Sequence, residues 1–328
     1  VFNEACYKDV ENIFKKHNAP MLEVNRRQAE VPDNCIPIRN KNGTAPGMWF
    51  ERKGKIFVSM PGVPHEMKAM MSEFVIPEIK KKFQLRTIYH TSVLTQGVGE
   101  SFLAERIKEW ERSLAEKEIK LAYLPSAGMV RLRLSISVEN ESDLRKIVET
   151  KITELHQLIP ELIYGYERYG EEQDTLEKII GELLRKKNQT LSTAESCTGG
   201  YIAHLISSVA GSSDYFRASI VAYANEIKMQ ELGVKKETLD KHGAVSKETA
   251  KQMAIGAKKK FKTDFAIATT GIAGPSGGTL EKPVGMVWIA IATPTKIITE
   301  KFQFNDNRER NIRRTALSAL NMFRKELL

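Results

Sequence analysis

The sequence predicts a multidomain α/β protein, and three observations support that prediction. The chain has 328 residues, which is too long for one small hydrophobic core and indicates two or three domains. Residues 86–165 read as strands and helices in the order βαββαβ, a common small-domain arrangement. From residue 190 to the end, apolar strands alternate with helices, so we expect a three-layer α/β domain with a mixed sheet.

Residues 1–85 form the first predicted domain. Its first 17 residues carry a helical apolar pattern, and a polar loop with turn-forming residues follows. Met48–Phe50 and Lys55–Met60 are predicted strands that Lys53-Gly54 joins as a hairpin. Pro61–Lys68 reads as a strand-turn-helix junction, because proline is tolerated in the first turn of a helix. This junction could cradle an anion, but a tight turn explains it equally well.

Residues 86–165 form the second predicted domain, a ferredoxin-like or KH-like unit. The run Val130–Val138 alternates strictly, so its apolar side chains face inward and Arg131 and Arg133 lie on the open face of a sheet. Exposed arginines on a half-buried strand need no partner. We therefore favour a structural or interdomain role for this face over contact with nucleic acid.

Residues 166–173 are polar and charged and are predicted to be a linker. Asp174 then begins the domain 174–328 as the N-cap of a helix, with Glu177 completing a capping-box pattern.

Composition excludes several classes of protein. The net charge of +9 suits nucleic acid or anionic substrates, but the lysines stand beside glutamates on apparent helix faces, which indicates a solvated surface. No run reaches the ~18 apolar residues of a membrane span, and we expect a cytoplasmic protein. The three cysteines are widely spaced, and the six histidines form no HExxH motif, so neither a disulfide framework nor a metal site is expected.

The segment Thr193–Gly200 has the strongest chemical character in the chain. It follows a short strand-like run and opens a helix, where unpaired backbone N–H groups and the helix dipole favour negative charge. Such a turn can hold a phosphate or a developing oxyanion. The alternative is a structural cap, with Ser196 or Thr198 satisfying the first amides of the helix.

Two further polar turns follow strands in the same domain, at Tyr223–Lys228 and Thr269–Gly278. Ligands of open α/β sheets bind in the crevice beyond the strand ends. Three such turns together would offer hydroxyl groups, backbone donors and one lysine to a common site.

Ser196 is the candidate nucleophile and Lys228 its candidate base. No histidine lies in the three turns, and a lysine in a partly desolvated pocket has a lowered pKa that suits a general base. The alternative for Lys228 is an ordinary surface lysine of a helix. Cys197 is a rival nucleophile, because a helix N-terminus lowers a thiol pKa, although it has no evident histidine partner.

Several uncommon peptides resemble one known family. Thr193–Gly200, Tyr223–Lys228, His242–Ser246, Gly271–Gly278 and Lys282–Gly285 together look like the C-terminal domain of the CinA family (competence/damage-inducible protein A) over about residues 170–328. Asn42–Gly47 and Pro61–Lys68 resemble the end of that family's N-terminal, molybdopterin-binding-like domain.

The resemblance implies that the C-terminal domain is an amidohydrolase. It would convert nicotinamide mononucleotide to nicotinate mononucleotide and ammonia without a cofactor, through Ser196 and Lys228, with Tyr223 as a third catalytic residue. Asn225 and Thr270 would orient the reacting groups, and glycine-rich backbone would bind the oxyanion or the phosphate, where Arg313 or Arg314 would supply charge. The remaining residues expected to bind substrate are Glu195, Cys197, Thr198, Gly199, Gly200, Gly271 and Gly274.

The chain departs from the family at its beginning. Family members usually start with a strand and a glycine-rich, acidic loop that is linked to metal-dependent ADP-ribose pyrophosphatase activity, and this sequence begins at Val1 without it. We therefore expect only part of that domain, with an incomplete site for a divalent metal and ADP-ribose. Two alternative functions stay open, a nucleotide pyrophosphatase and a non-catalytic nucleic-acid or competence protein. We expect a homodimer, no membrane association and no firm nucleic-acid partner.

Overall fold

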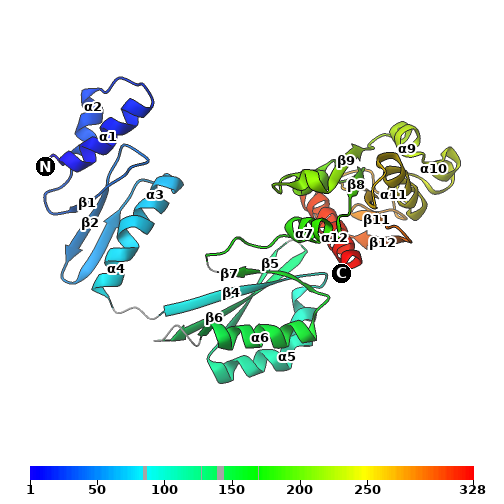
Figure 1. Ribbon diagram of the computed structural model, residues 1–328, viewed down its shortest axis with the longest axis horizontal. Helices are drawn as coiled ribbons and strands as arrows, with labels where there is room; N and C mark the ends of the chain where they lie inside the picture. Colours follow the sequence, from blue (N-terminus) through cyan, green and yellow to red (C-terminus); the bar gives the residue numbers. More distant parts are fainter. Residues whose placement is uncertain (84–86, 127, 139–143, 169) are drawn as a thin grey trace. The chain divides into compact units, whose positions relative to one another are not determined.

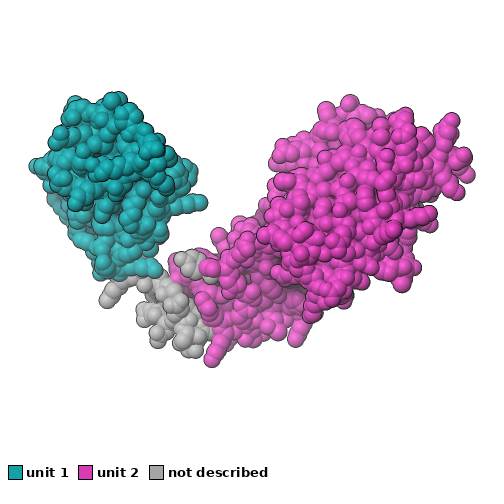
Figure 2. Space-filling view, turned by 45° about the horizontal axis from the view of Figure 1, so that its top comes forward, with its two compact units in different colours: residues 1–86 teal, residues 87–328 magenta. Residues whose placement is uncertain are grey.

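The computed structural model describes residues 1–83, 87–126, 128–138, 144–168 and 170–328. The chain divides into two compact units, Val1–Arg86 and Thr87–Leu328, which Figure 2 colours separately. Both units mix helices and sheets (Figure 1), so the chain is a multidomain α/β protein as predicted.

The first unit combines short helices with one antiparallel sheet of order β1-β2-β3. Its elements are α1 (Glu4–Lys16), α2 (Glu23–Arg26), the 3₁₀ turn η1 (Arg27–Ala29), β1 (Ile36–Ile38), β2 (Gly47–Arg52), β3 (Lys55–Ser59), α3 (Pro64–Met70), the π-helical η2 (Met71–Val75) and α4 (Ile76–Lys82). The hairpin prediction is confirmed, because Arg52 pairs with Lys55 across a turn in which Lys53 and Gly54 both have positive φ, the type I′ arrangement. The sequence did not predict β1 and α2, which are too short to show a periodic pattern.

The small domain of the second unit is a four-stranded antiparallel sheet of order β5-β6-β4-β7. Two helices, α5 and α6, cover one face of this sheet (Figure 1). The elements are β4 (Thr87–Gln96), α5 (Glu100–Leu114), η3 (Ala115–Lys117), β5 (Lys120–Ser126), β6 (Met129–Val138), α6 (Leu144–Leu158) and β7 (Ile163–Arg168). The predicted order βαββαβ is confirmed.

The C-terminal domain is built on a five-stranded sheet of order β12-β11-β10-β8-β9. The strands β10, β8 and β9 are parallel, while β11 and β12 are antiparallel, so the sheet is mixed as predicted. The elements are α7 (Leu176–Lys187), β8 (Leu191–Glu195), α8 (Tyr201–Ser207), η4 (Ser212–Asp214), β9 (Phe216–Val221), α9 (Asn225–Leu232), α10 (Lys236–His242), α11 (Lys247–Phe261), β10 (Phe265–Gly271), β11 (Met286–Ala292), β12 (Ile297–Gln303) and α12 (Arg308–Leu327).

The two faces of the five-stranded sheet have different side chains. Isoleucines such as Ile267 and Ile289 pack against α7, α8 and α12, whereas alanines such as Ala266 and Ala290 pack against α9 and α11. Helix α11 also lies close to α9, since a Cβ added at Gly256 would fall 1.9 Å from the backbone oxygen of Leu232. Two helical layers therefore enclose the sheet, and the layer that includes α9 lies against methyl groups.

The junction between the small domain and the C-terminal domain differs from the predicted linker. Strand β7 continues to Arg168, and the amide of Tyr166 donates to the carboxylate of Asp174 at 2.8 Å. Asp174 is therefore not the helix cap. Thr175 has that role, because its side chain accepts from the amide of Lys178. The pattern D-T-L-E offers two capping residues in succession, and the tertiary contact engages the first.

Candidate active site

The turn after β8 is fixed against β10. The amide of Ser196 donates to the backbone oxygen of Thr269 at 2.9 Å, which extends the pairing of the two strands by one residue. The hydroxyl groups of Thr198 and Thr269 are hydrogen-bonded at 2.7 Å. Ser196 is thereby held at the carboxyl end of two parallel strands.

The helix after this turn is capped by Glu195. Its buried carboxylate accepts from the amides of Gly200 at 3.1 Å, Ile202 at 3.0 Å and Ala203 at 2.8 Å. The alternative in which Ser196 or Thr198 caps the helix is wrong, because α8 begins after Gly200 and the Glu195 carboxylate accepts from its first amides. An anion at a helix N-terminus is stabilised by the same amides and dipole that would bind a ligand. The structure thus fills this N-terminus with an internal carboxylate.

Lys228 is buried near the start of α9, with 1% of its surface exposed. Its Nζ donates to the backbone oxygens of Ala222 at 2.7 Å and Tyr223 at 3.0 Å. Burial lowers the pKa of the amine, which favours the neutral form. A neutral amine has two N–H groups and one lone pair, so the two carbonyls use its donors and leave the lone pair for a proton. The alternative of a surface lysine is wrong.

Cys197 is next to the candidate nucleophile but has the opposite electrostatics from the prediction. It is 7% exposed, and burial raises the pKa of its thiol to about 12. The nearby Lys228 lowers that pKa, but burial is the larger effect. The expected lowering at a helix N-terminus is therefore wrong, because Glu195 occupies that N-terminus. A protonated thiol is a poor nucleophile.

The third polar turn follows β10. Thr270 is buried, and its hydroxyl donates to the backbone oxygen of Ala244 at 2.8 Å. A Cβ at Gly271 would lie 2.7 Å from the backbone oxygen of Met286, so only glycine fits between the end of β10 and the start of β11. The hydrogen bond from Thr270 to Ala244 connects the turn after β10 to the peptide His242–Ser246. Ala244 and Val245 therefore line the same pocket as Thr270.

Arg308, the first residue of α12, lies beside the second and third polar turns. Its guanidinium donates to the backbone oxygen of Gly274 at 2.8 Å and to the phenol of Tyr223 at 3.2 Å. It thereby joins the second and third polar turns. From the sequence we expected Arg313 or Arg314 to supply this charge. Arg313 is exposed, and Arg314 stacks on Phe304 instead.

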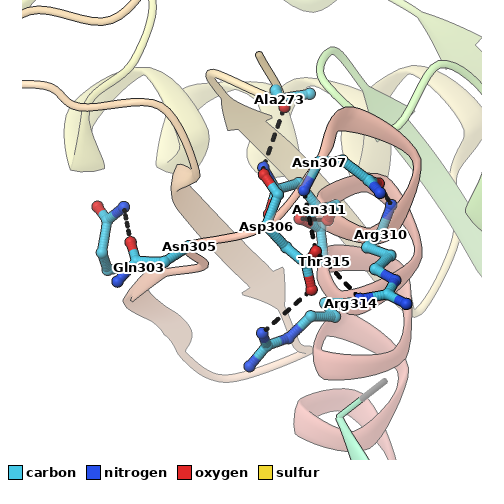
Figure 3. A network of polar contacts seen from close by, with 9 residues as sticks. All are labelled: Ala273, Gln303, Asn305, Asp306, Asn307, Arg310, Asn311, Arg314 and Thr315. Atoms are coloured by element: carbon cyan, nitrogen blue, oxygen red, sulfur yellow. Dashed lines mark hydrogen bonds and ion pairs between the residues drawn. The ribbon is translucent and has the colours of Figure 1, made fainter. Parts of the chain in front are cut away.

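A polar network sets the position of the start of α12 (Figure 3). The buried amide of Asn311 donates to the backbone oxygens of Ala273 at 3.0 Å and Asp306 at 2.8 Å. Asn307 caps the helix by accepting from the amide of Arg310 at 2.9 Å. These contacts fasten α12 to the glycine-rich turn, and Arg308 follows directly after the cap.

The three turns and Arg308 surround one pocket of about 230 Å³. Its lining consists of Ser196, Cys197, Tyr223, Asn225, Lys228, Ala244, Val245, Thr270, Gly271, Ala273 and Arg308. The predicted residues that do not line it are Glu195, Thr198, Gly199, Gly200, Gly274, Arg313 and Arg314. The amides of Gly199 and Gly200 donate to Ser196 and Glu195, so these two donors are engaged within the turn. The predicted convergence of the three turns is confirmed.

Sequence reasoning missed four lining residues: Ala244, Val245, Ala273 and Arg308. The first two belong to the peptide His242–Ser246, which carried the family resemblance, but alanine and valine have no reactive side chains. One signal could have identified Arg308. Asn307 is a typical N-cap residue and so predicts that the last helix begins at Arg308, close to the ends of the strands.

The first unit has polar groups at its own strand-turn-helix junction. The side chain of Asn40 donates to the Glu66 carboxylate at 2.6 Å and to the backbone oxygen of Ala45 at 2.8 Å. Glu66 is therefore hydrogen-bonded to the loop between β1 and β2, which contains Asn40 and Ala45. No group of three or more metal-ligating side chains occurs among the described residues, and none of the described helices has the length and apolar character that crossing a bilayer requires.

Three family models match the chain. Residues 173–327 match the CinA C-terminal domain, residues 90–165 the damage-inducible protein CinA KH domain, and residues 6–81 a probable molybdopterin binding domain.

Similar proteins cover the whole chain. A CinA-like protein of Cytophaga hutchinsonii is 46% identical over 327 residues, which is 100% of this chain and 77% of the relative. A CinA-like protein of Flavobacterium psychrophilum is 49% identical over 319 residues, which is 97% of this chain and 74% of the relative. The crystal structure of competence/damage inducible protein CihA from Agrobacterium tumefaciens is 41% identical, covers 46% of this chain and 93% of that one, and has a TM-score of 0.45.

Proposed function

This chain belongs to the CinA family, and we propose that its C-terminal domain hydrolyses the carboxamide of nicotinamide mononucleotide. The products would be nicotinate mononucleotide and ammonia. Ser196 would be the nucleophile and Lys228 the general base, as the resemblance to the family implies.

One observation carries the proposal: Ser196 and the buried amine of Lys228 line the same pocket, 32 positions apart in sequence. A serine hydroxyl attacks an amide only when a base removes its proton. Burial lowers the pKa of Lys228, and two carbonyl oxygens orient its amine, so the lone pair is available for that proton. Cys197 does not compete, because its thiol stays protonated.

The reaction would proceed through an acyl-enzyme. The Ser196 oxygen bonds to the carboxamide carbon while Lys228 takes its proton. The carbon–nitrogen bond then breaks, and Lys228 gives the proton to the departing ammonia. Water attacks the ester, Lys228 accepts the proton of the water, and the proton returns to the serine oxygen as the carboxylate product leaves.

The remaining lining groups suit an amide that carries a phosphate. Within the described part of the chain, the backbone amides of Cys197 and Thr198 have no acceptor, and the first of them adjoins the nucleophile, where an oxyanion would develop. Arg308 keeps donors beyond its two hydrogen bonds, and a guanidinium fork binds phosphate well. Asn225 and Thr270 would orient the carboxamide.

An ammonia-release assay on nicotinamide mononucleotide tests the proposal. Ser196→Ala and Lys228→Ala should each lower kcat/KM by at least about 1,000-fold, because either change removes a group that acts in every step. Ser208→Ala and Lys236→Ala, at exposed positions, are the matched controls and should retain activity. Full activity of the Ser196 variant would refute the nucleophile assignment.

The proposal requires no metal, so a chelator should leave the rate unchanged. The cytoplasmic location and the homodimer that we expected from the sequence belong to the same proposal, and sedimentation analysis checks the association. We do not propose a pyrophosphatase reaction for the first unit, since Glu66 is engaged by Asn40 and the described residues offer no metal-ligand set.

A further inference from the structure

A second, larger pocket lies in the unit Thr87–Leu328, where the small domain meets the C-terminal domain. Its volume is about 460 Å³, within the usual range for sites that bind small molecules. The turn between β4 and α5 forms one side, and the end of β12 with one face of α12 forms the other. We call it the seam pocket; its lining includes Gln96, Gly97, Gly99, Glu100, Phe304 and Arg314.

Arg314 gives the seam pocket an incompletely compensated positive charge. Its guanidinium lies over the Phe304 ring, 4.9 Å from the centroid. Its nearest carboxylate oxygen, on Asp306, is 3.9 Å away, beyond hydrogen-bond distance, and Asp306 also pairs with Arg310 at 3.5 Å (Figure 3). Among the described residues no acceptor bonds to Arg314. One carboxylate thus serves two guanidinium groups, and the arginine facing the pocket retains its hydrogen-bond donors.

The opposite wall of the seam pocket presents a helix N-terminus. Helix α5 has 15 residues and begins after Gly99, and no capping hydrogen bond from a side chain is present at this end. The first amides of a helix have no acceptor within the helix and carry partial positive charge. Gly97 and Gly99 add no side chains there, so a ligand can reach the backbone. Arg314 and this N-terminus therefore favour the same sign of ligand charge from two sides.

Gln96 supplies an independent sign of a missing partner. It is 3% exposed, borders the seam pocket, and its Oε1 has no hydrogen-bond partner within the described ranges. Leaving a buried acceptor unsatisfied is unfavourable, because the group has lost its hydrogen bonds to water without gaining another. The last torsion of a glutamine side chain is soft, so its amide can turn toward a donor that enters the pocket.

We propose that the seam pocket binds a small phosphate ester with hydroxyl groups. The phosphate would bind between Arg314 and the first turn of α5, and a hydroxyl would donate to Gln96. Glu100, an exposed carboxylate at the rim, opposes an anion and limits the affinity. This site is separate from the pocket of Ser196 and has no residue in common with it.

Calorimetric titration with ribose 5-phosphate tests the proposal. The titrations use the full chain with Arg308→Gln, so that the guanidinium of the other pocket does not contribute. In this background binding should persist, Arg314→Gln should weaken it by roughly tenfold or more, and Arg313→Gln should not weaken it. Arg313 is the matched control, because it is the neighbouring arginine on α12 but is exposed and outside the seam pocket.

A further variant separates binding from damage to the fold. Glu100→Gln removes the opposing charge and should tighten binding severalfold, a change that misfolding does not produce. No binding at millimolar ribose 5-phosphate, equal affinity of the Arg314 and Arg313 variants, or loss of all binding on Arg308→Gln alone would each overturn the proposal. The proposal is independent of the amidohydrolase activity.

Discussion

Arg308 donates a hydrogen bond to the phenol of Tyr223 at 3.2 Å, although the two residues lie 85 positions apart. Tyr223 lies between β9 and α9, the helix that contains Lys228, and Arg308 is the first residue of α12. This contact places the start of α12 beside the pocket that Ser196 and Lys228 line, and it gives that pocket a guanidinium group.

Replacing Arg308 should affect substrate binding more than chemistry. We expect Arg308→Gln to raise KM for nicotinamide mononucleotide by about tenfold or more with a smaller change in kcat, because a charge-assisted contact to phosphate is made before and during the reaction. Steady-state kinetics measure the split, with Arg313→Gln as the control. An unchanged KM would remove the phosphate role of Arg308.

The pH dependence of the reaction should report the Lys228 amine. Because burial lowers its pKa from the usual 10.5, kcat/KM should rise with pH along a single ionisation whose midpoint lies below that value. Lys228→Arg should be inactive at every pH, since a guanidinium does not deprotonate. A rate that is constant through this range would contradict a lysine base.

The pH dependence of the free energy of unfolding should report the lowered pKa of Lys228 without any activity measurement. The pKa of Lys228 is lower in the folded chain than in the unfolded chain, so between these two values the unfolded state binds more protons and the free energy of unfolding rises with pH. Lys228→Met removes this contribution. As the pH rises toward the usual lysine pKa of 10.5, the wild type should gain stability against urea relative to the variant. A parallel pH profile of the two proteins would contradict a buried amine of lowered pKa.

Glu195 should act on the fold and not on the substrate. Glu195→Gln places an amide donor against the first amides of α8, so we expect a loss on the order of 2–4 kcal/mol in the free energy of unfolding. Glu182→Gln, on the exposed side of α7, should change it by less than about 0.5 kcal/mol. If the Glu195 variant kept its stability but lost affinity for substrate, the carboxylate would be a ligand-binding group after all.

Cys197 should be dispensable for the chemistry. Its thiol is buried and has a raised pKa, so Cys197→Ala should retain kcat within about tenfold of the wild type. Iodoacetamide labelling followed by peptide mass analysis should modify the more exposed Cys35 before Cys197. A loss of activity as large as that of Ser196→Ala would revive the thiol as the nucleophile.

Sequence patterns were sufficient for most of the fold. The strict alternation of Val130–Val138 and the Lys53-Gly54 turn were read correctly because their physical causes are local. The short β1 and α2 were missed because their stability comes from neighbours in the fold. The capping residue of α7 was misplaced by one position, since only the tertiary contact between Asp174 and Tyr166 decides between two adjacent candidates.

The pocket that Ser196 and Lys228 line could be predicted only in part. Ser196 and Lys228 were identified because they lie in polar turns after strands and could act as a nucleophile and a base, whereas Thr270 was identified through the family resemblance. Arg308 could not be selected among the arginines of α12, because the choice depends on how Asn311 fastens that helix to Ala273. Glu195 was assigned to the ligand with the rest of the family-like segment, and the sequence does not show that the amides of Gly200, Ile202 and Ala203 bind its carboxylate.

The alanine face of the five-stranded sheet has a consequence for how this protein tolerates change. Methyl groups set the spacing between the sheet and the helices α9 and α11, so a bulkier residue at Ala266 or Ala290 would lift this layer. The amine of Lys228 moves with α9, so such a shift would change its position relative to Ser196, which lines the same pocket. The proposed chemistry is therefore more sensitive to mutations on the alanine side of the sheet, while the isoleucine side can exchange one branched side chain for another with only a cost in packing.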